Sequence, residues 1–556
     1  MCATLILVAF IGGFILQSSA EMAESESKDP NKPHIIILMA DDMGFNDVSF
    51  RKTSQVYTPN IDALGYQGLI LNRHYVPHMC TPSRAALLTG INPVHTGMQH
   101  YVIRSCEPYG LPLDLILLPQ YLKKAGYKTH LVGKWHLGNA KKAFIPTERG
   151  FDSFFGFYTG AIEYYNHTDG ASGSAVTETG ALSVRGYDFR RNEEVTYEGF
   201  GQYATYLFTN ESLKIIGDHN PKKPLFLVAT YNAPHAADGP VLLEAPQDEI
   251  DKINYISDPN LRTFAAMMNI MDRGIGQIIK KLSHKDMLKN SVILFYSDNG
   301  SPIEGLYANE GSNYPLRGQK SSPWEGGIRV PAIIWSPAMK YRHGVSSKLI
   351  HNTDWLPTFL ALAGIRPKSN VDGFNMWPTL TKNLPSPRDE MIHNIDPIDQ
   401  FVSVYYRGWK YINGTTDGGQ YDGWLSPSSN CKDQFGVKYT ESVMKSDTWK
   451  ALSPFARKTI TSKTIRRIRK MTEVYCPAKI PYSGVCEPLK APCLFKITDD
   501  PCEMNNLAQV YPFRTYLMQI LVKKWSANVV YPINQPSDFA GCDPRKHNGT
   551  FTWWLD

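Results

Sequence analysis

The fold class is decided by the stretch Ile35-Ile36-Ile37-Leu38-Met39, which is followed at once by Ala40-Asp41-Asp42. A continuous run of apolar and β-branched residues is typical of a strand that is buried on both faces. Similar runs recur further along the chain, at Thr129–Val132, Leu225–Thr230, Val292–Tyr296 and Ala332–Trp335. Helix-like segments lie between them, for example Leu118–Ala125 and Leu261–Leu282. This alternation predicts an α/β fold, with a large, mixed, mostly parallel sheet that is flanked by helices.

The chain has 556 residues, which is more than one hydrophobic core usually supports, so we expect two domains. After about Pro385 the alternation fades, while turn residues, cysteines and basic residues become more frequent. We therefore predict a catalytic domain over 33–385 and a smaller, disulfide-containing α+β domain over 386–556. The formal charge of +6 is modest for this length. It argues against a dedicated nucleic-acid binder and is compatible with an anionic substrate.

The first twenty residues carry no charged side chain, and an apolar run from Leu5 to Leu16 ends near the small residues Ser18 and Ala20. This pattern predicts a cleaved signal peptide over 1–20, because the run is too short to span a bilayer. The alternative is an N-terminal membrane anchor. With a cleaved signal, the protein would enter the secretory pathway without stable membrane insertion and be either lysosomal or secreted. The predicted glycosylation sites are Asn166, Asn210, Asn413 and Asn548.

Of nine cysteines, Cys2 would leave with the signal peptide, and disulfides are the default for the others in an oxidising compartment. Only Cys80 and Cys106 lie in the first half of the chain. The remaining six are Cys431, Cys476, Cys486, Cys493, Cys502 and Cys542. A basic run extends from Arg457 to Lys470. The plain interpretation of this run is a solvated helix face. The more specific interpretation is a patch that binds an acidic polysaccharide or a membrane surface.

Ligands of open α/β sheets bind at the carboxyl ends of the strands, so the residues that follow each strand carry the functional signal. Asp41 and Asp42 follow the first strand, and Asp298 with Asn299 follows the fourth. Such carboxylates repel one another unless a cation lies between them, and all-oxygen ligation favours Ca²⁺ or Mg²⁺. Taken alone, the Asp-Asp pair could be a helix cap. The same edge gathers groups suited to a sulfate or phosphate: Lys134, His136, His235 and, further on, Lys320.

Two long motifs occur in order along the chain: Cys80-Thr81-Pro82-Ser83-Arg84-Ala85-Ala86-Leu87-Leu88-Thr89-Gly90 and Gly126-Tyr127-Lys128-Thr129 through Gly133-Lys134-Trp135-His136-Leu137-Gly138. Both resemble sulfatase signatures. The chain is thereby identified as a member of the sulfatase family, most similar to arylsulfatase B-like enzymes and their invertebrate relatives. The resemblance implies the alkaline phosphatase/sulfatase-like version of the fold. It also implies a sulfuric ester hydrolase of the arylsulfatase type.

In sulfatases the signature cysteine is converted to formylglycine (3-oxoalanine) by a formylglycine-generating enzyme, and the resemblance places this change at Cys80. The hydrated aldehyde would act as nucleophile beside one Ca²⁺ per chain. By matched position, the calcium ligands would be Asp41, Asp42, residue 80, Asp298 and Asn299. Arg84 would hold the diol, and Lys134 and Lys320 would neutralise sulfate charge. His136 would act as a base, and His235 would bind sulfate and help to protonate the leaving oxygen. Although Asn299 starts a formal sequon, a buried ligand would not be glycosylated.

Family likeness also implies a disulfide between Cys106 and Cys542. Cys493 and Cys502 flank the short segment Leu494–Pro501, which predicts that they pair. This leaves three cysteines in 431–486 without an assigned partner. One departure from the subgroup stands after His235, where the sequence reads Ala236-Ala237-Asp238.

Two other functions remain open. The first is a phosphatase or phosphodiesterase of the alkaline phosphatase superfamily, which would use Ser or Thr as nucleophile and two zinc ions. The second is a catalytically silent secreted binding protein that keeps the fold. Within the sulfatase class, the sequence leaves aryl sulfates, sulfated sugars and sulfated metabolites as possible substrates.

Overall fold

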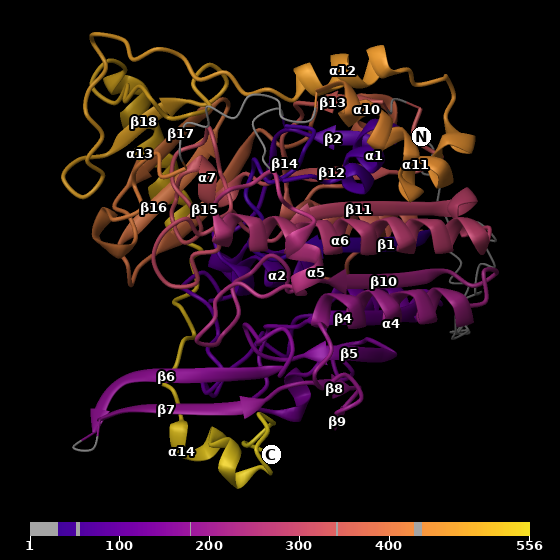
Figure 1. The fold of residues 1–556 in the computed structure, drawn as a ribbon. Coiled ribbons are helices and arrows are strands. Elements are labelled where there is room, and N and C mark those ends of the chain that lie inside the picture. The colour runs from indigo at the N-terminus through magenta and orange to yellow at the C-terminus, as the bar shows by residue number, and fades with distance from the viewer. Residues whose placement is uncertain (1–31, 52–55, 178–179, 341–342, 427–435) are drawn as a thin grey trace, which may run out of the picture.

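The computed structural model describes residues 32–51, 56–177, 180–340, 343–426 and 436–556. The predicted signal peptide (1–20) and Cys431 lie outside these residues. A ten-stranded sheet forms the centre of the molecule, in the order β13-β2-β12-β11-β1-β10-β4-β5-β8-β9 (Figure 1). Its strands are β1 (His34–Ala40), β2 (Leu69–Leu71), β4 (Lys128–Lys134), β5 (Ser153–Phe157), β8 (Arg190–Arg191), β9 (Glu194–Val195), β10 (Leu225–Thr230), β11 (Ser291–Ser297), β12 (Ala332–Trp335) and β13 (Gly344–Ser346).

The middle of this sheet is parallel. β1 lies between β10 and β11, with Ile37 opposite Val228 on one side and Leu294 on the other. β4 continues the parallel arrangement beyond β10, whereas β12 runs antiparallel to β11. All five strands expected from the sequence are present, and the predicted mixed, mostly parallel α/β sheet is confirmed.

The continuous apolar run of β1 has a simple explanation, because the strand contributes to two hydrophobic cores. Ile35, Ile37 and Met39 face one core, and Ile36 and Leu38 face the other. Successive side chains of a strand point to opposite faces, so a strand covered on both sides needs no alternation.

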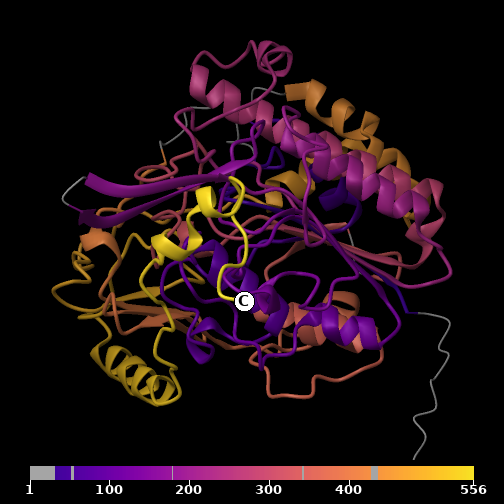
Figure 2. The same ribbon diagram turned by 90° about the horizontal axis from the view of Figure 1, so that it is seen from below.

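Helices cover both faces of the sheet (Figure 2). The expected helices are present as α3 (Leu118–Lys124) and as α6 (Pro259–His284), whose first turn is capped by the Asp258 side chain. The other helices of the first 385 residues are α1 (Pro59–Gln67), α2 (Cys80–Thr89), α4 (Ala204–Asp218), α5 (Gln247–Asp251), α7 (Glu325–Ile328), α8 (Trp355–Leu362) and α9 (Trp377–Lys382). Two further strand pairs are β3 (His74–Tyr75) with β14 (Ile350–His351), and β6 (Thr168–Thr177) with β7 (Gly180–Tyr187).

A second, four-stranded antiparallel sheet follows in the C-terminal part, in the order β15-β16-β17-β18. Its strands are β15 (Glu390–Asp396), β16 (Phe401–Tyr406), β17 (Trp409–Asn413) and β18 (Cys493–Lys496). The helices of this part are α10 (Gly436–Lys445), α11 (Asp447–Leu452), α12 (Ser462–Met471), α13 (Pro512–Ser526) and α14 (Phe539–Cys542). The smaller C-terminal unit with its own sheet agrees with the predicted fold class.

Not all of the C-terminal part stays with the small sheet. Helix α11 packs against α1 and α6 of the large sheet, and Tyr439 and Leu452 belong to the same core as Ile36. The domain boundary near residue 385 therefore stays a prediction. Buried charges connect the two units, because the Lys410 ammonium on β17 lies 2.8 Å from Glu503 and 3.3 Å from Glu325 on α7.

Three disulfides are formed by described residues, and one prediction is corrected. Cys106 is bonded to Cys542, the pair implied by the family likeness. Cys502 is bonded to Cys476 and Cys493 to Cys486, so the predicted Cys493–Cys502 bridge is wrong. Cys493 begins strand β18, and four extended residues rise about 13 Å, which carries the following chain away from it. Short sequence separation therefore does not bring Cys502 back within bonding distance.

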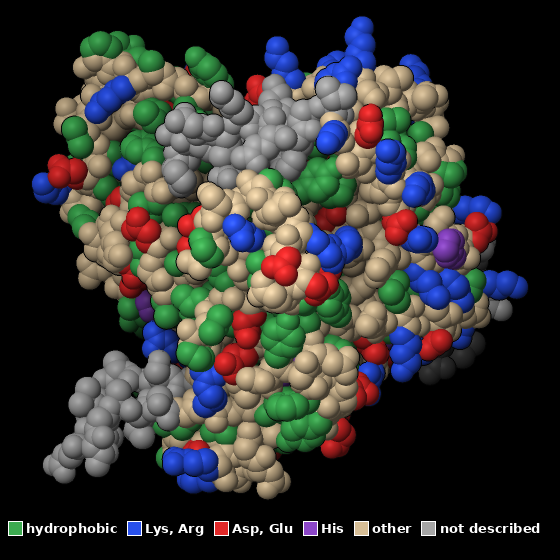
Figure 3. Space-filling view, in the orientation of Figure 1, with side chains coloured by type: hydrophobic (Ala, Val, Ile, Leu, Met, Phe, Trp, Pro, Cys, Tyr) green, Lys and Arg blue, Asp and Glu red, His purple; other side chains and the backbone are tan. Residues whose placement is uncertain are grey.

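The basic run lies partly on α12. The helix buries Ile465 and Ile468, and it exposes cations at the i, i+3, i+4 and i+7 positions: Lys463, Arg466, Arg467 and Lys470. Lys and Arg side chains gather over α10–α12 in the space-filling view (Figure 3). This placement agrees with the plain interpretation, a solvated helix face, and leaves a polyanion partner untested. None of the described helices combines the length and the apolar character needed to cross a membrane.

Candidate active site and metal centre

Ten residues singled out from the sequence meet at the carboxyl edge of the large sheet. Each has less than a tenth of its surface exposed. They are Asp41, Asp42, Cys80, Arg84, Lys134, His136, His235, Asp298, Asn299 and Lys320. Parallel strands end at one edge of a sheet. Seven of these ten residues lie at or after the ends of β1, β4, β10 or β11, so segments far apart in sequence meet at that edge.

Carboxylates from the ends of β1 and β11 form the centre of the site. The backbone N–H of Asp42 donates to Oδ1 of Asp298 over 3.2 Å. The Asn299 amide nitrogen lies 2.6 Å from Oδ1 of Asp42. Gly300 is needed beside them, because a Cβ there would lie 1.8 Å from the Gly326 carbonyl oxygen. The Asp-Asp pair is thus part of a buried cluster and does not cap a helix.

Cys80 is the first residue of α2, and Arg84 follows one turn later on the same side of the helix. The Cys80 Sγ lies 3.6 Å from Oδ1 of Asp41 and 4.0 Å from Oδ1 of Asp42. The Arg84 guanidinium donates to Oδ2 of Asp298 over 2.8 Å. Among the described cysteines, Cys80 is the one without a disulfide. The helix N-terminus adds partial positive charge next to it.

Two lysines complete the charged shell. The Lys134 ammonium at the end of β4 lies 2.7 Å from Oδ2 of Asp41, and that of Lys320 lies 2.7 Å from Oδ2 of Asp42. With Arg84, these cations match the three carboxylates in number. Burial lowers the pKa of Lys320, but the nearby Asp42 carboxylate outweighs it, so the pKa lies above its usual range and the lysine stays charged.

In each of the two histidines, one ring nitrogen is held by a backbone carbonyl. His136 donates from Nε2 to the Ile103 carbonyl over 2.9 Å, which leaves its Nδ1 without a partner among the described residues. His235 has its Nδ1 2.6 Å from the Ala236 carbonyl, and its Nε2 lies 3.3 Å from the Lys320 ammonium. Burial lowers the pKa of both rings, so each is neutral in the free site.

Burial also acts on the thiol and on the carboxylates. It raises the pKa of Cys80 to about 12, so the unmodified thiol is not a nucleophile at neutral pH. Burial and the charge of Asp41 raise the pKa of Asp298. Burial favours the neutral form of Asp41 as well, but Lys134, His235 and Arg84 together hold its pKa below the usual value.

The side chains fit a hard divalent cation. Atoms of Asp41, Asp42, Cys80 and His235 that could bind a metal all lie within 4.8 Å of one another. The Asn299 carbonyl oxygen is buried without a partner, while the amide nitrogen faces Asp42. Turning this amide over would place its oxygen among the carboxylates, where a cation would bind it. The oxygen-rich donor set selects Ca²⁺ or Mg²⁺ over zinc.

A cavity of about 320 Å³ opens from Cys80, His136, His235 and Lys320. Its outer walls contain residues that the sequence did not single out, among them Tyr101, Asp169, Glu304, Tyr307, Asp417 and Phe539. Asp169 lies on β6, the others come from loops and from the C-terminal part, and none follows a predicted strand. The one sequence signal for this outer wall is Asp238, which belongs to the departure from the subgroup after His235. Its carboxylate accepts a hydrogen bond from the hydroxyl of the wall residue Tyr307 over 2.6 Å.

The carboxyl edge of a parallel sheet with clustered carboxylates, a helix-borne cysteine and a shell of buried cations has the character of a hydrolase-type site for an anionic ester. Comparison with known proteins gives the family: a model described as "Sulfatase" matches residues 33–365, and the chain belongs to the sulfatase family.

The chain is similar to curated proteins of this family. It is 40% identical to arylsulfatase J of Mus musculus over 382 residues, which is 68% of this chain and 60% of that protein. It is 31% identical to N-acetylgalactosamine-6-sulfatase of Mus musculus over 417 residues, or 73% and 74% of the two chains. The chain thus spans about three fifths of the first relative's length.

Solved structures share the fold. The crystal structure of Ps i-CgsB in complex with k-i-k-neocarrahexaose matches with a TM-score of 0.68 at 24% identity, covering 93% of this chain and 98% of that one. The PsFucS1 sulfatase from Pseudoalteromonas sp. matches with a TM-score of 0.63 at 24% identity, covering 92% and 93%.

Proposed function

We propose that this protein is a calcium-dependent sulfatase that hydrolyses sulfate esters with a formylglycine made from Cys80. The observation that carries the proposal is the position of Cys80. It is an unbridged, buried cysteine at a helix N-terminus, with its Sγ 3.6 Å from Asp41 and with Arg84 one turn away. A cysteine kept for packing or for a disulfide has no need of these charged neighbours.

The charge balance of the site supports an anionic substrate. Arg84, Lys134 and Lys320 offset Asp41, Asp42 and Asp298, so a bound dication would leave the site with a net charge of +2. The sulfate group would bind to the Lys134 and Lys320 ammonium groups. Both ammonium groups are buried, and charge-assisted hydrogen bonds are strong in a buried site.

When present, formylglycine at residue 80 would supply the nucleophilic oxygen and the calcium ion would supply positive charge beside it. Arg84 would hold residue 80 in place from the next turn of α2. Because the Nδ1 of His235 donates to the Ala236 carbonyl, its Nε2 is the ring nitrogen left for proton transfer. The Lys320 ammonium, 3.3 Å away, would give a proton to Nε2, and Nε2 would pass it to the leaving oxygen. The free Nδ1 of His136 would accept a proton on the residue 80 side of the cavity.

Maturation would occur in the secretory pathway. Cys80 is only 1% exposed, so a formylglycine-generating enzyme would have to act before the chain folds. Asn166, Asn210, Asn413 and Asn548 are exposed and available to glycosylation, whereas Asn299 is fully buried. Whether the enzyme is then lysosomal or secreted depends on whether these sugars carry a sorting signal.

Mass spectrometry of the peptide that contains residue 80 tests the proposal, together with hydrolysis of nitrophenyl sulfate and nitrophenyl phosphate with and without a calcium chelator. We expect the aldehyde at residue 80 and chelator-sensitive sulfate hydrolysis. Active protein with only intact thiol would refute the mechanism. Faster hydrolysis of the phosphate would favour a phosphatase, and no turnover of either ester would favour a silent binding protein.

A further inference from the structure

The cavity beside Cys80 is lined by residues from many separate parts of the chain, and three of these parts lie far from the strand ends. Ile103 and Ser105 come from the loop after α2, Asp417 from the turn after β17, and Ser537 and Phe539 from the C-terminal tail. A volume of about 320 Å³ is at the lower end of the range for small-molecule sites, which is roughly 300–1,000 Å³. The cavity therefore has room for one ring-sized group next to the sulfate position.

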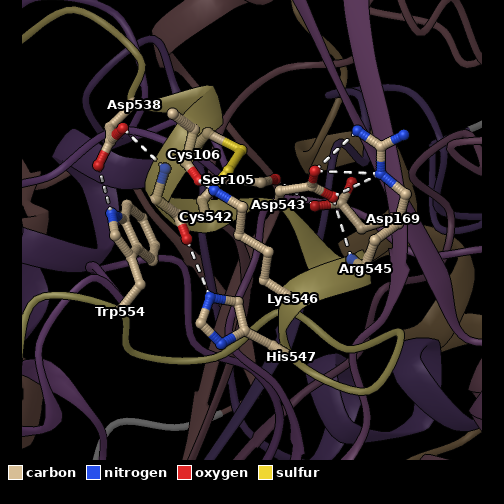
Figure 4. Close-up of a disulfide and its surroundings, with 12 residues drawn as sticks. Ser105, Cys106, Asp169, Asp538, Cys542, Asp543, Arg545, Lys546, His547 and Trp554 are labelled. Atoms are coloured by element: carbon tan, nitrogen blue, oxygen red, sulfur yellow. Dashed lines mark hydrogen bonds and ion pairs between the residues drawn. A yellow bond between two sulfur atoms is a disulfide. The ribbon is translucent and has the colours of Figure 1, made fainter.

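The C-terminal wall is fixed in place by covalent and polar contacts. Cys542 on α14 is bonded to Cys106, next to the cavity residue Ser105 (Figure 4). The Asp538 carboxylate accepts from the Gly541 backbone over 2.9 Å and from the Trp554 indole over 2.9 Å. Phe539 is thereby held against the cavity by a rigid turn.

A neutral acid and aromatic rings line the inner wall. Asp169 is 3% exposed and accepts a hydrogen bond from the Ser105 hydroxyl. Burial, and then the nearby Asp238 carboxylate, hold the pKa of Asp169 well above its usual range, so it remains protonated. A carboxylic acid both donates and accepts hydrogen bonds, as the hydroxyl groups of a substrate require. Tyr101 and Tyr421 add aromatic surface to the cavity wall.

The outer rim is acidic. Glu304 and Asp417 are exposed residues at the cavity, and the Ser321 hydroxyl donates to Asp417 over 3.5 Å. Among the described lining residues, Arg104 is the only cation apart from Lys320 and the two histidines of the buried site. Its guanidinium lies 5.1 Å from the centre of the Tyr101 ring. A second anionic group on the substrate would thus meet two carboxylates and a single cation.

We propose that this cavity selects sulfate esters whose leaving group is one uncharged, hydroxyl-bearing ring, such as a neutral sugar, and discriminates against leaving groups that carry a second sulfate or a carboxylate. The proposal rests on the sulfatase function and adds the substrate class. Asp169 recognises a hydroxyl of the ring, the tyrosines contact its apolar faces, and Glu304 and Asp417 repel a further negative charge.

The test compares kcat/KM of the purified full-length enzyme for three esters: nitrophenyl sulfate, an N-acetylhexosamine monosulfate, and the same N-acetylhexosamine with two sulfates. We expect wild-type enzyme to prefer the monosulfate to the disulfate by about tenfold at low ionic strength, and by less at high salt. A wild-type enzyme that prefers the disulfate would overturn the proposal.

The rim charges are tested by the double variant Glu304→Gln, Asp417→Asn. Both residues are exposed, so the variant should fold, and the disulfate-to-monosulfate ratio should rise by about threefold or more. The matched control is Asp218→Asn, an exposed carboxylate at the end of α4, at the opposite edge of the sheet. The control should leave the ratio unchanged. An unchanged ratio in the double variant would refute the role of the rim.

Asp169→Ala tests hydroxyl recognition, because alanine removes the hydrogen-bonding group and nitrophenyl sulfate carries no hydroxyl group to recognise. Asp169→Asn is the conservative control, because an amide donates and accepts as the protonated acid does, and it should keep the wild-type KM. In Asp169→Ala, KM for the N-acetylhexosamine monosulfate should rise by about tenfold relative to that for nitrophenyl sulfate. Equal effects on both esters would contradict the assigned role. Failure of the wild-type enzyme to hydrolyse any of the three esters would refute the sulfatase function itself, whereas turnover with the wrong preference would refute only the selectivity.

Discussion

The ammonium group of Lys134 lies 2.7 Å from Oδ2 of Asp41, and neither side chain is exposed to solvent. Removing one partner of such a pair leaves an uncompensated buried charge. Asp41 is also a proposed calcium ligand, so two different cations can neutralise it. This double dependence leads to a prediction that links stability to metal binding.

Lys134→Met should lower the free energy of unfolding by about 3–5 kcal/mol in chelator-treated protein. The loss should be smaller with excess calcium, because the ion takes over the neutralisation of Asp41. Urea unfolding with and without calcium measures both values. Lys450→Met, at an exposed position, serves as control and should change stability by less than about 0.5 kcal/mol. Equal destabilisation of the Lys134 variant in both conditions would argue against calcium at this site.

Cys80→Ala should abolish activity while keeping the fold. Alanine is a good helix former, and the lost sulfur atom leaves only a small gap at the start of α2. Turnover of nitrophenyl sulfate should fall by more than about 10³-fold, as expected when a nucleophile is removed. Circular dichroism and the melting temperature check the fold. Near-normal turnover with an unchanged fold would be incompatible with the proposed nucleophile.

Glu503 should make the protein more stable at acidic than at neutral pH. Burial raises its pKa from 4.5 to about 7, with Lys410 opposing this effect. The folded state therefore binds a proton that the unfolded chain has already lost, so the free energy of unfolding falls as the pH rises from 4.5 to about 7. Unfolding by urea across this pH window measures the slope.

Glu503→Gln mimics the protonated form, so its stability should vary less across the same pH range. Glu487→Gln is the matched control, because Glu487 is exposed and pairs only with Lys490. It should keep the wild-type slope. If the Glu503 variant keeps the full wild-type slope, the assignment to this group is wrong.

Peptide mapping without reduction should find Cys486 linked to Cys493 and Cys476 linked to Cys502. The physical reason is the path of β18, which begins at Cys493 and carries the chain away from it before Cys502 is reached. Recovery of a peptide that links Cys493 to Cys502 would contradict the structure. The same digest also reports on the Cys106–Cys542 bridge.

The large sheet, and the meeting of the inner residues at its edge, could be predicted from the sequence because both depend on local patterns. The run Ile35–Met39 identifies a strand, and Asp41 follows it in sequence, so its position at the sheet edge could be inferred. The outer cavity could not be inferred in this way. Asp169, Asp417 and Phe539 come together only through tertiary packing, and no periodicity or spacing relates them.

Disulfide pairing failed for a related reason. Pairing depends on where the chain goes between two cysteines, and the direction of β18 was not available from the spacing of Cys493 and Cys502. The C-terminal helices show the same limit, because α11 packs on α6 of the large sheet although it follows the small sheet in sequence.

The bridge between Cys106 and Cys542 joins residues 436 positions apart and fixes the turn that carries Phe539. During biosynthesis this turn leaves the ribosome long after Cys80 and the carboxylates. A premature stop shortly before Ser537 would thus yield a protein with its chemical groups intact and one side of its cavity missing. Late truncations of this kind should weaken substrate affinity before they affect the reaction itself.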